Sequence, residues 1–184
     1  MSADNQQERF INKIIDSIPS DLGHYLAGFA DGEGSFNVSF RKRKDYALPW
    51  KISLCFNISQ KEFEILKIFQ TILHCGTMRS RPDGIWYYEV NNLPEICSTI
   101  IPLFKKFPFL SKKKKRDFDK FCQIAELMSL NQHHFISGIR KIVEIRDKMN
   151  DGGKRKYTSK IILKEIDENP QRLHAKPDLT IGMI

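Results

Sequence analysis

The chain has 184 residues, of which 41% are hydrophobic and 28% are charged, so it is long enough to bury one core but hardly two. Lys and Arg number 30 against 22 Asp and Glu, and the net charge of +8 indicates a polyanionic partner. No apolar run approaches the ~20 residues of a membrane span, and the N-terminus lacks the hydrophobic stretch of a signal peptide.

The four cysteines are widely spaced and form no C-x-x-C pair, so neither a disulfide framework nor a structural zinc site is expected. We therefore expect an intracellular protein that is not secreted and has no membrane partner. A bacterial or archaeal cytoplasm and an organelle would fit equally well.

Hydrophobic periodicity divides the chain into three parts. Residues 1–20 predict an N-terminal helical arm, because apolar residues recur at helical spacing until Pro19 ends the pattern. Residues 21–168 hold all the remaining predicted elements. Residues 169–184 contain two prolines and no periodicity, which predicts a C-terminal tail.

The central part predicts a helix and then two β-hairpins separated by a second helix. The expected elements are a helix over 22–31, strands over 35–41 and 51–59, a helix ending before Gly76, strands over 77–81 and 85–91, and a helix over 93–101 that breaks at Pro102. Ser59 followed by Glu62 fits a capping box for the second helix. Three more helices are expected over 112–130, 133–149 and 159–166. This order predicts an α+β fold with an αββαββ core and an antiparallel sheet, followed by C-terminal helices.

Alternation along the strands predicts a sheet with one dry face and one wet face. The dry face would carry Phe36, Val38, Phe40, Ile52, Leu54 and Phe56. The wet face would carry Asn37, Ser39, Arg41, Arg43, Lys51, Ser53, Cys55, Asn57, Arg79, Arg81, Tyr87 and Glu89. Such a surface suits phosphate contacts and base-edge hydrogen bonds in a duplex groove, although an ordinary solvated sheet face is the alternative.

A run of five cations over 112–116 lies at the start of a predicted helix, where the positive end of the helix dipole disfavours them. A nearby phosphate would offset this cost; an ordinary solvated helix start is the alternative.

The most informative stretch is Leu26-Ala27-Gly28-Phe29-Ala30-Asp31-Gly32-Glu33-Gly34. Gly28 and Gly32 are four residues apart on one helix face, where their missing side chains allow another backbone to approach closely. Glu33 falls where the helix gives way to the first strand, and a carboxylate gains nothing from the negative end of a helix. A bound Mg²⁺ would offset that cost.

This stretch resembles the motif of the LAGLIDADG homing endonucleases, and the resemblance extends roughly over residues 22–166. It implies a saddle-shaped sheet that lies in the major groove of DNA. It also implies that Glu33 holds a divalent metal, Mg²⁺ with Mn²⁺ as a possible substitute, together with the main-chain oxygen of Gly32, whereas Asp31 is structural. The chain contains one motif, which in this family goes with a homodimer, and the expected dimer contacts are Leu26, Gly28, Phe29 and Gly32.

Three further segments carry the resemblance. Ser59-Gln60-Lys61 resembles the segment whose glutamine orders water near the scissile phosphate. Leu110-Ser111-Lys112-Lys113 resembles the segment that supplies an active-site lysine, assigned here to Lys113 with Lys112 as the second choice. The loop over 153–157 resembles one that contacts the DNA backbone, which implicates Lys154, Arg155 and Lys156; a flexible exposed loop is equally consistent.

One departure concerns Glu64, since some relatives carry a basic active-site residue at this position. Either that role is absent here, or Lys61, Lys112 or Lys114 takes it.

The resemblance implies a homodimeric endonuclease that binds a long, nearly palindromic DNA duplex and hydrolyses one phosphodiester in each strand with Mg²⁺. Two alternatives stay open: an RNA maturase that assists intron splicing, and a DNA-binding regulator that no longer cleaves. Retention of Glu33, Gln60 and Lys113 together argues against the loss of cleavage.

Overall fold

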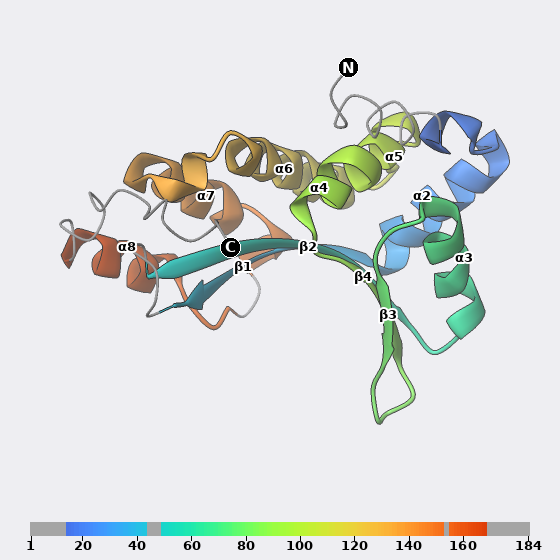
Figure 1. Cartoon of the computed structure of the whole chain (residues 1–184), viewed down its shortest axis with the longest axis horizontal. Helices are drawn as coiled ribbons and strands as arrows, with labels where there is room; N and C mark the ends of the chain where they lie inside the picture. Colours follow the sequence, from blue (N-terminus) through green and yellow to red (C-terminus); the bar gives the residue numbers. More distant parts are fainter. Residues whose placement is uncertain (1–13, 44–48, 153–154, 169–184) are drawn as a thin grey trace, which may run out of the picture.

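A computed structural model describes residues 14–43, 49–152 and 155–168 of the chain (Figure 1). The predicted C-terminal tail and most of the N-terminal arm lie outside these residues, although 14–17 are helical and Ile15 and Ile18 are buried in the core. None of the described helices has the length and apolarity that a membrane crossing requires.

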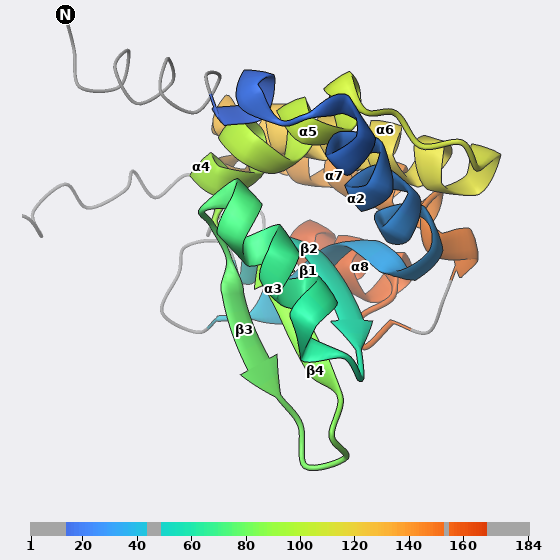
Figure 2. The same cartoon turned by 90° about the vertical axis from the view of Figure 1, so that its right-hand side faces the viewer.

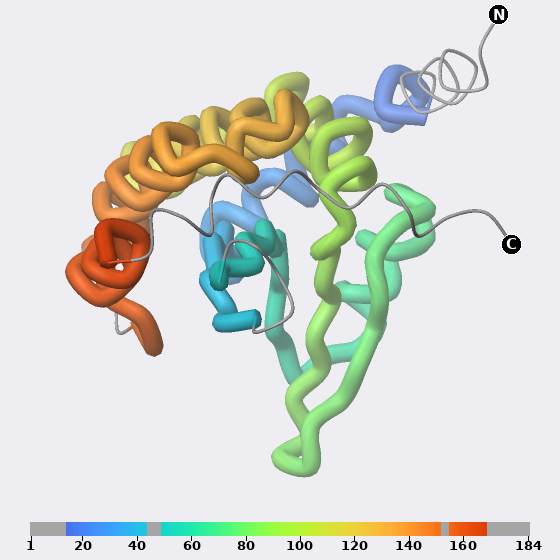
Figure 3. Tube along the Cα trace, turned by 60° about the vertical axis from the view of Figure 1, so that its left-hand side comes forward, coloured from blue at the N-terminus to red at the C-terminus, as the bar shows by residue number. Residues whose placement is uncertain are grey.

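The sheet has four strands, β1 (Gly34–Lys42), β2 (Trp50–Gln60), β3 (Thr77–Ser80) and β4 (Trp86–Val90). Their order is β1-β2-β4-β3, and every neighbouring pair is antiparallel. The turn of the β3–β4 hairpin projects beyond the helices (Figures 1 and 3). The predicted pair of hairpins is therefore confirmed, and the central strands β2 and β4 join them.

Helix α2 (Ser20–Glu33) leads into β1, and α3 (Phe63–Leu73) links the two hairpins. After β4 the chain is helical: α4 (Leu93–Glu95), a π-helical segment (Ile96–Ile100), α5 (Ile101–Lys106), α6 (Lys112–Ser129), α7 (Ile136–Asp147) and α8 (Ser159–Glu168). Helices α4 to α7 gather on one side of the sheet (Figures 1 and 2). The α+β class and the αββαββ order followed by helices are confirmed.

The core lies between this helical layer and the sheet. Five of the six side chains predicted for the dry face are buried, and Val38 is half-buried against them. Phe36 lies at the centre, with ring centroids 5.2 Å from Phe56 and 5.0 Å from Phe121 of α6. Aromatic packing between β1, β2 and the C-terminal helices thus fixes which face of the sheet stays open to solvent.

The predicted capping box is wrong. Strand β2 continues through Gln60, which pairs with Trp86 of β4, so Ser59 is held in an extended ladder and cannot cap a helix. Helix α3 begins at Phe63, and its N-cap residue Glu62 makes no side-chain capping hydrogen bond. Strand pairing, a non-local interaction, overrides the local signal.

The predicted helix break at Pro102 is also wrong. The chain stays helical from Leu93 to Lys106, with the π-helical segment directly before Pro102. Pro102 occupies the first turn of α5, where a missing backbone N–H is tolerated, and the wider π turn accommodates the change in hydrogen bonding.

Candidate metal site and nucleic-acid interface

Glu33 is the last residue of α2, and the chain turns sharply into β1 directly after it. A Cβ atom on Gly34 would lie 2.6 Å from the carbonyl oxygen of Ala30, so this turn requires glycine. Glu33 and Gly32 are both exposed, and within the described ranges the Glu33 carboxylate makes no hydrogen bond or ion pair. In the last helical turn the carbonyl of Ala30 accepts from the backbone N–H of Gly34, whereas the carbonyl groups after it have no intrahelical partner. An unpaired carboxylate therefore lies beside main-chain oxygens at the negative end of a helix.

This donor set suits a hard divalent cation. Oxygen ligands are the ones that Mg²⁺ prefers, and it commonly uses one or two carboxylates with water and phosphate. No cluster of three or more His, Cys, Asp or Glu occurs in the part of the chain that the structure describes. A cation at Glu33 would therefore complete its shell with main-chain, water or phosphate oxygens.

Asp31 lies two residues earlier, and both of its carboxylate oxygens accept hydrogen bonds within the protein. Its carboxylate accepts hydrogen bonds from the backbone N–H groups of Leu110 (3.1 Å) and Ser111 (2.9 Å) and from the Ser111 hydroxyl. Partial burial would raise the pKa of Asp31, but the hydrogen bonds from Ser111 and Leu110 outweigh it and lower the pKa below its usual value. Asp31 thus ties the end of α2 to the start of α6, which agrees with its expected structural role.

The lysines at the start of α6 point to different partners. Lys113, the lysine assigned from sequence, places its Nζ 2.7 Å from the carboxylate of Asp151 and is 65% exposed. Lys114 is half-buried, and its Nζ donates to the carbonyl oxygen of Gly34, the residue after Glu33. Desolvation is the main cause that lowers the pKa of Lys114, against the attraction of Asp31, Asp117 and Glu33. Lys114 therefore lies nearer the candidate metal site than Lys113 does, while Lys112 is exposed.

Gln60 lies at the same end of the sheet as Glu33. The register pairs Gly34 with Ile58, so Gln60 is only two residues beyond the start of β1. Its side-chain Oε1 accepts a hydrogen bond from the backbone N–H of Lys61 (2.9 Å). Glu64 is exposed in the first turn of α3.

The wet face is formed as the alternation predicts. Within β1 and β2 the odd-numbered side chains are exposed or half-buried, namely Asn37, Ser39, Arg41, Lys51, Ser53, Cys55 and Asn57. Arg79, Tyr87 and Glu89 continue this face across β3 and β4, and Arg81 follows the end of β3. Arg43 follows the end of β1, where its backbone N–H bonds to the carbonyl of Pro49. The predicted reading residues thus share one surface.

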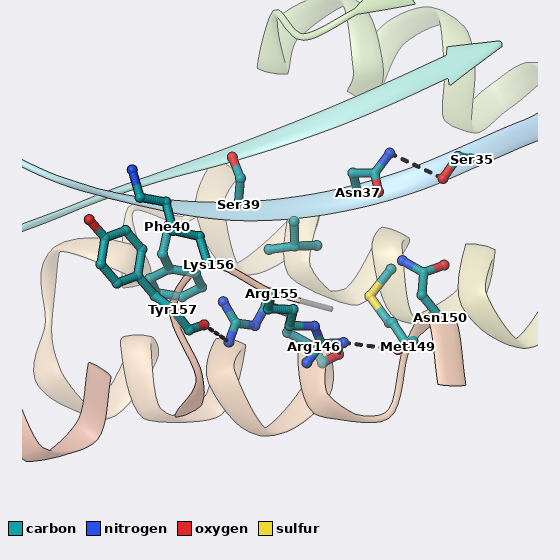
Figure 4. A pocket seen from close by; sticks show the side chains of 11 residues that line it. Ser35, Asn37, Ser39, Phe40, Arg146, Met149, Asn150, Arg155, Lys156 and Tyr157 are labelled. Atoms are coloured by element: carbon teal, nitrogen blue, oxygen red, sulfur yellow. Dashed lines mark hydrogen bonds between the residues drawn. The ribbon is translucent and has the colours of Figure 1, made fainter. Parts of the chain in front are cut away.

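A cavity of about 430 Å³ opens beside the outer edge of β1 (Figure 4). Asn37 and Ser39 lie on one side of the strand, and Arg155, Lys156 and Tyr157 lie on the other. The cavity therefore connects the wet face to the connection between α7 and α8.

Arg155 is held by the protein itself. Its Nη1 is 2.7 Å from the carboxylate of Asp147, and its Nη2 donates to the carbonyl oxygens of Arg146 (2.6 Å) and Met149 (2.9 Å). These contacts close the C-terminal end of α7. Lys156 is exposed, and Lys154 lies outside the described residues.

Sequence reasoning missed two residues, Arg146 in the lining of this cavity and Asp151 beside the start of α6. Arg146 is buried at a core position of α7, with its guanidinium 4.7 Å from the Phe40 ring centroid, and burial is the main cause that lowers its pKa to about 10. Asp151 accepts from both Lys113 and Arg116, the latter at 2.6 Å. Arg146 gives no sequence signal, and Asp151 directly precedes two glycines, a pattern that indicates only a turn.

Helix α2 has free space around Gly28 and Gly32 on its exposed face. A Cβ atom on Gly28 or Gly32 would meet nothing within 4 Å among the described residues. Phe29 is half-buried and packs near Phe69 of α3, with ring centroids 6.0 Å apart. Leu26 is fully buried in the chain's own core, so its predicted role as a dimer contact is wrong: it faces the opposite side of the helix.

Comparison with known proteins agrees with this arrangement. Residues 26–125 match the family model described as LAGLIDADG endonuclease, and the chain belongs to this family. The chain is 29% identical over 134 residues to the probable intron-encoded endonuclease 2 of Neurospora crassa, an alignment that covers 70% of this chain and 29% of that protein. This chain thus spans less than a third of the length of that relative.

Two solved structures share the fold. The archaeal intron-encoded homing endonuclease I-Vdi141I in complex with DNA is similar with a TM-score of 0.74 and 27% identity, over 80% of this chain and 96% of that one. Meganuclease I-SmaMI bound to uncleaveable DNA is similar with a TM-score of 0.68 and 28% identity, over 74% of this chain and 47% of that one.

Proposed function

We propose that this chain is a homing endonuclease that binds a long, nearly palindromic DNA duplex as a homodimer and hydrolyses one phosphodiester in each strand with Mg²⁺. The observation that carries the proposal is the end of α2, where the unpaired Glu33 carboxylate, open main-chain oxygens and the Lys114 ammonium converge beside a cationic sheet face.

Glu33 and the main-chain oxygen of Gly32 are the groups that would hold the cation. A divalent cation held there would lower the pKa of bound water and neutralise charge that develops on the phosphate. Gln60, at the same end of the sheet, is suited to orient water, because its amide both donates and accepts. No protein nucleophile is needed.

The ammonium that assists electrostatically is assigned to Lys114 rather than Lys113, the match by resemblance. Its Nζ bonds to the carbonyl of the residue after Glu33, whereas the Nζ of Lys113 pairs with Asp151. Lys114→Met and Lys113→Met form a matched pair for single-turnover cleavage assays. We expect a large loss of rate only for Lys114→Met, and the reverse result would return the role to Lys113.

Binding of a duplex is supported by the length and charge of the sheet. Strand β2 has 11 residues, which span ~36 Å, about one turn of B-form DNA. The wet face and the start of α6 carry the cations that suit phosphate contacts. The similar I-Vdi141I and I-SmaMI structures contain DNA.

Two copies of this chain are proposed to act together. The chain has one motif, and Gly28 and Gly32 leave the outer face of α2 open for a second helix. The chain spans nearly all of I-Vdi141I but just under half of I-SmaMI, as expected if two copies of this chain correspond to one longer chain.

The proposal is tested with the DNA that flanks the gene, joined without the gene, as a labelled duplex. With Mg²⁺ we expect cleavage of both strands at one place, and with a chelator we expect binding without cleavage. Absence of site-specific binding and cleavage would contradict the proposal, and stimulation of intron splicing in its place would support the maturase alternative.

A further inference from the structure

Glu89 is an acid in the middle of a surface that is otherwise polar and cationic. It lies on β4, opposite Asn57 of β2 and Thr77 of β3, and its side chain is only 18% exposed. A carboxylate on a surface that meets a polyanion costs binding energy unless it accepts a hydrogen bond from a cytosine amino group or has a role within the protein.

Both oxygens of the Glu89 carboxylate are already used within the protein. The Nη2 of Arg79 lies 3.3 Å from Oε1 and 3.3 Å from Oε2. The thiol of Cys55 donates to Oε1 from the neighbouring strand at 3.4 Å. Burial and then the charge of Glu89 raise the pKa of Cys55 to about 12, so the thiol stays protonated and keeps donating at neutral pH.

These contacts orient Arg79 but leave some of its hydrogen-bond donors unused. Its side chain is 61% exposed, and its guanidinium carbon lies 5.5 Å from the Tyr87 ring centroid. Its Nε and Nη1 make no hydrogen bond to any residue that the structure describes. Glu89 thus engages Nη2 alone. That nitrogen carries a second N–H, which forms a two-donor edge with either Nη1 or Nε.

Arg81, on the same hairpin, has no such acid. Its guanidinium carbon lies 4.4 Å from the Tyr87 ring centroid, and it makes no ion pair with the residues described. In the absence of DNA, Arg79 is therefore oriented by an ion pair and Arg81 is not.

We propose that Glu89 is a positioning residue: it orients Arg79 to read one base pair in each half-site and does not itself contact a base. The inference rests on the proposed function, because it assumes that the wet face reads DNA. An arginine that reads guanine needs both donors of its fork in register with O6 and N7, and prior orientation removes the entropic cost of finding that geometry.

Loss of the Glu89 charge should affect the specificity of DNA binding and its affinity differently. Without the negative charge of Glu89, Arg79 is freed to pair with phosphates, which every sequence offers. Glu89→Gln should therefore bind DNA as tightly as the wild type or more tightly, while discriminating less at one base pair. Loss of a purely structural residue would weaken affinity and preference together.

The test is a profile of binding over targets in which each base pair is replaced in turn. We expect Glu89→Gln and Arg79→Ala to lose preference at the same base pair, by about tenfold, and the double variant to lose no more than Arg79→Ala alone. Arg81→Ala should act at a different base pair and add to Glu89→Gln. Cys55→Ala, which leaves the charge unchanged, should give a smaller loss at the Arg79 position.

Glu126→Gln makes the same change of charge on the exposed side of α6 and should leave the profile unchanged. If Glu89→Gln keeps full preference at the Arg79 position, or alters a base pair that Arg79→Ala leaves alone, the inference is wrong. If the wild type shows no base preference at all, the proposed function fails instead.

Discussion

The start of α6 and the β3–β4 hairpin both gather cations, but their acids are used in opposite ways. At α6, Asp31 accepts hydrogen bonds from the backbone at the start of the helix, and Asp151 forms an ion pair with Lys113. On the hairpin, Glu89 orients Arg79 and leaves most of that side chain exposed. A cluster of like charges therefore indicates little about function until the partner of each charge is known.

The largest effect is expected from closing the open face of α2. Gly28→Leu should push the proposed partner helix away and give a monomer or insoluble protein, with at least a roughly 100-fold loss of DNA binding, because one half-site then binds alone. Light scattering and binding assays check this. Lys164→Leu, which adds a similar side chain on exposed α8, should stay dimeric. A monomeric wild type would rule out the dimer.

The next effect concerns the junction of α2 and α6. Asp31→Asn removes a charged acceptor of three hydrogen bonds and should lower the free energy of unfolding by about 1–2 kcal/mol, given that the carboxylate is partly solvated. Because the folded-state pKa of Asp31 is lowered, its contribution is present at neutral pH and is lost as the pH falls through that pKa.

Urea denaturation from pH 7 down to pH 3 measures this contribution. The wild type should lose more stability over this range than Asp31→Asn does. Parallel curves for the two proteins would show that the carboxylate does not act through its charge.

Arg155 and Lys156, the two described cations of the α7–α8 connection, should differ in whether they affect stability or DNA binding. Arg155→Met should lower thermal stability, because its guanidinium closes the end of α7, and Lys156→Met should not. Lys156→Met should instead reduce the slope of log K against log salt by about 0.9, the value for one phosphate contact. An unchanged slope would show that Lys156 does not meet DNA.

Sequence reasoning succeeded where the signal is local. The period of two in β1 and β2 separated the dry residues from the wet ones, and Phe36 and Asn37 lie on the faces predicted for them. It failed where strand pairing overrides a local pattern, as at Ser59.

The partners of the cations could not be predicted, because they are far apart in sequence. Arg116 meets Asp151 only because the α7–α8 connection folds back beside α6, and Lys114 meets Gly34 across 80 positions. The motif predicted that Glu33 is available and that Asp31 is structural, but not which lysine lies beside them.

The two acids of the motif are assigned different tasks, Asp31 in the fold and Glu33 in cleavage. Single-turnover cleavage by Glu33→Gln, measured together with its melting temperature and its DNA binding in metal-free buffer, tests this division. We predict cleavage below about 1% of the wild-type rate, with melting and binding unchanged, because the amide is a poor metal ligand of nearly the same shape. Cleavage at the wild-type rate would show that Glu33 does not hold the metal.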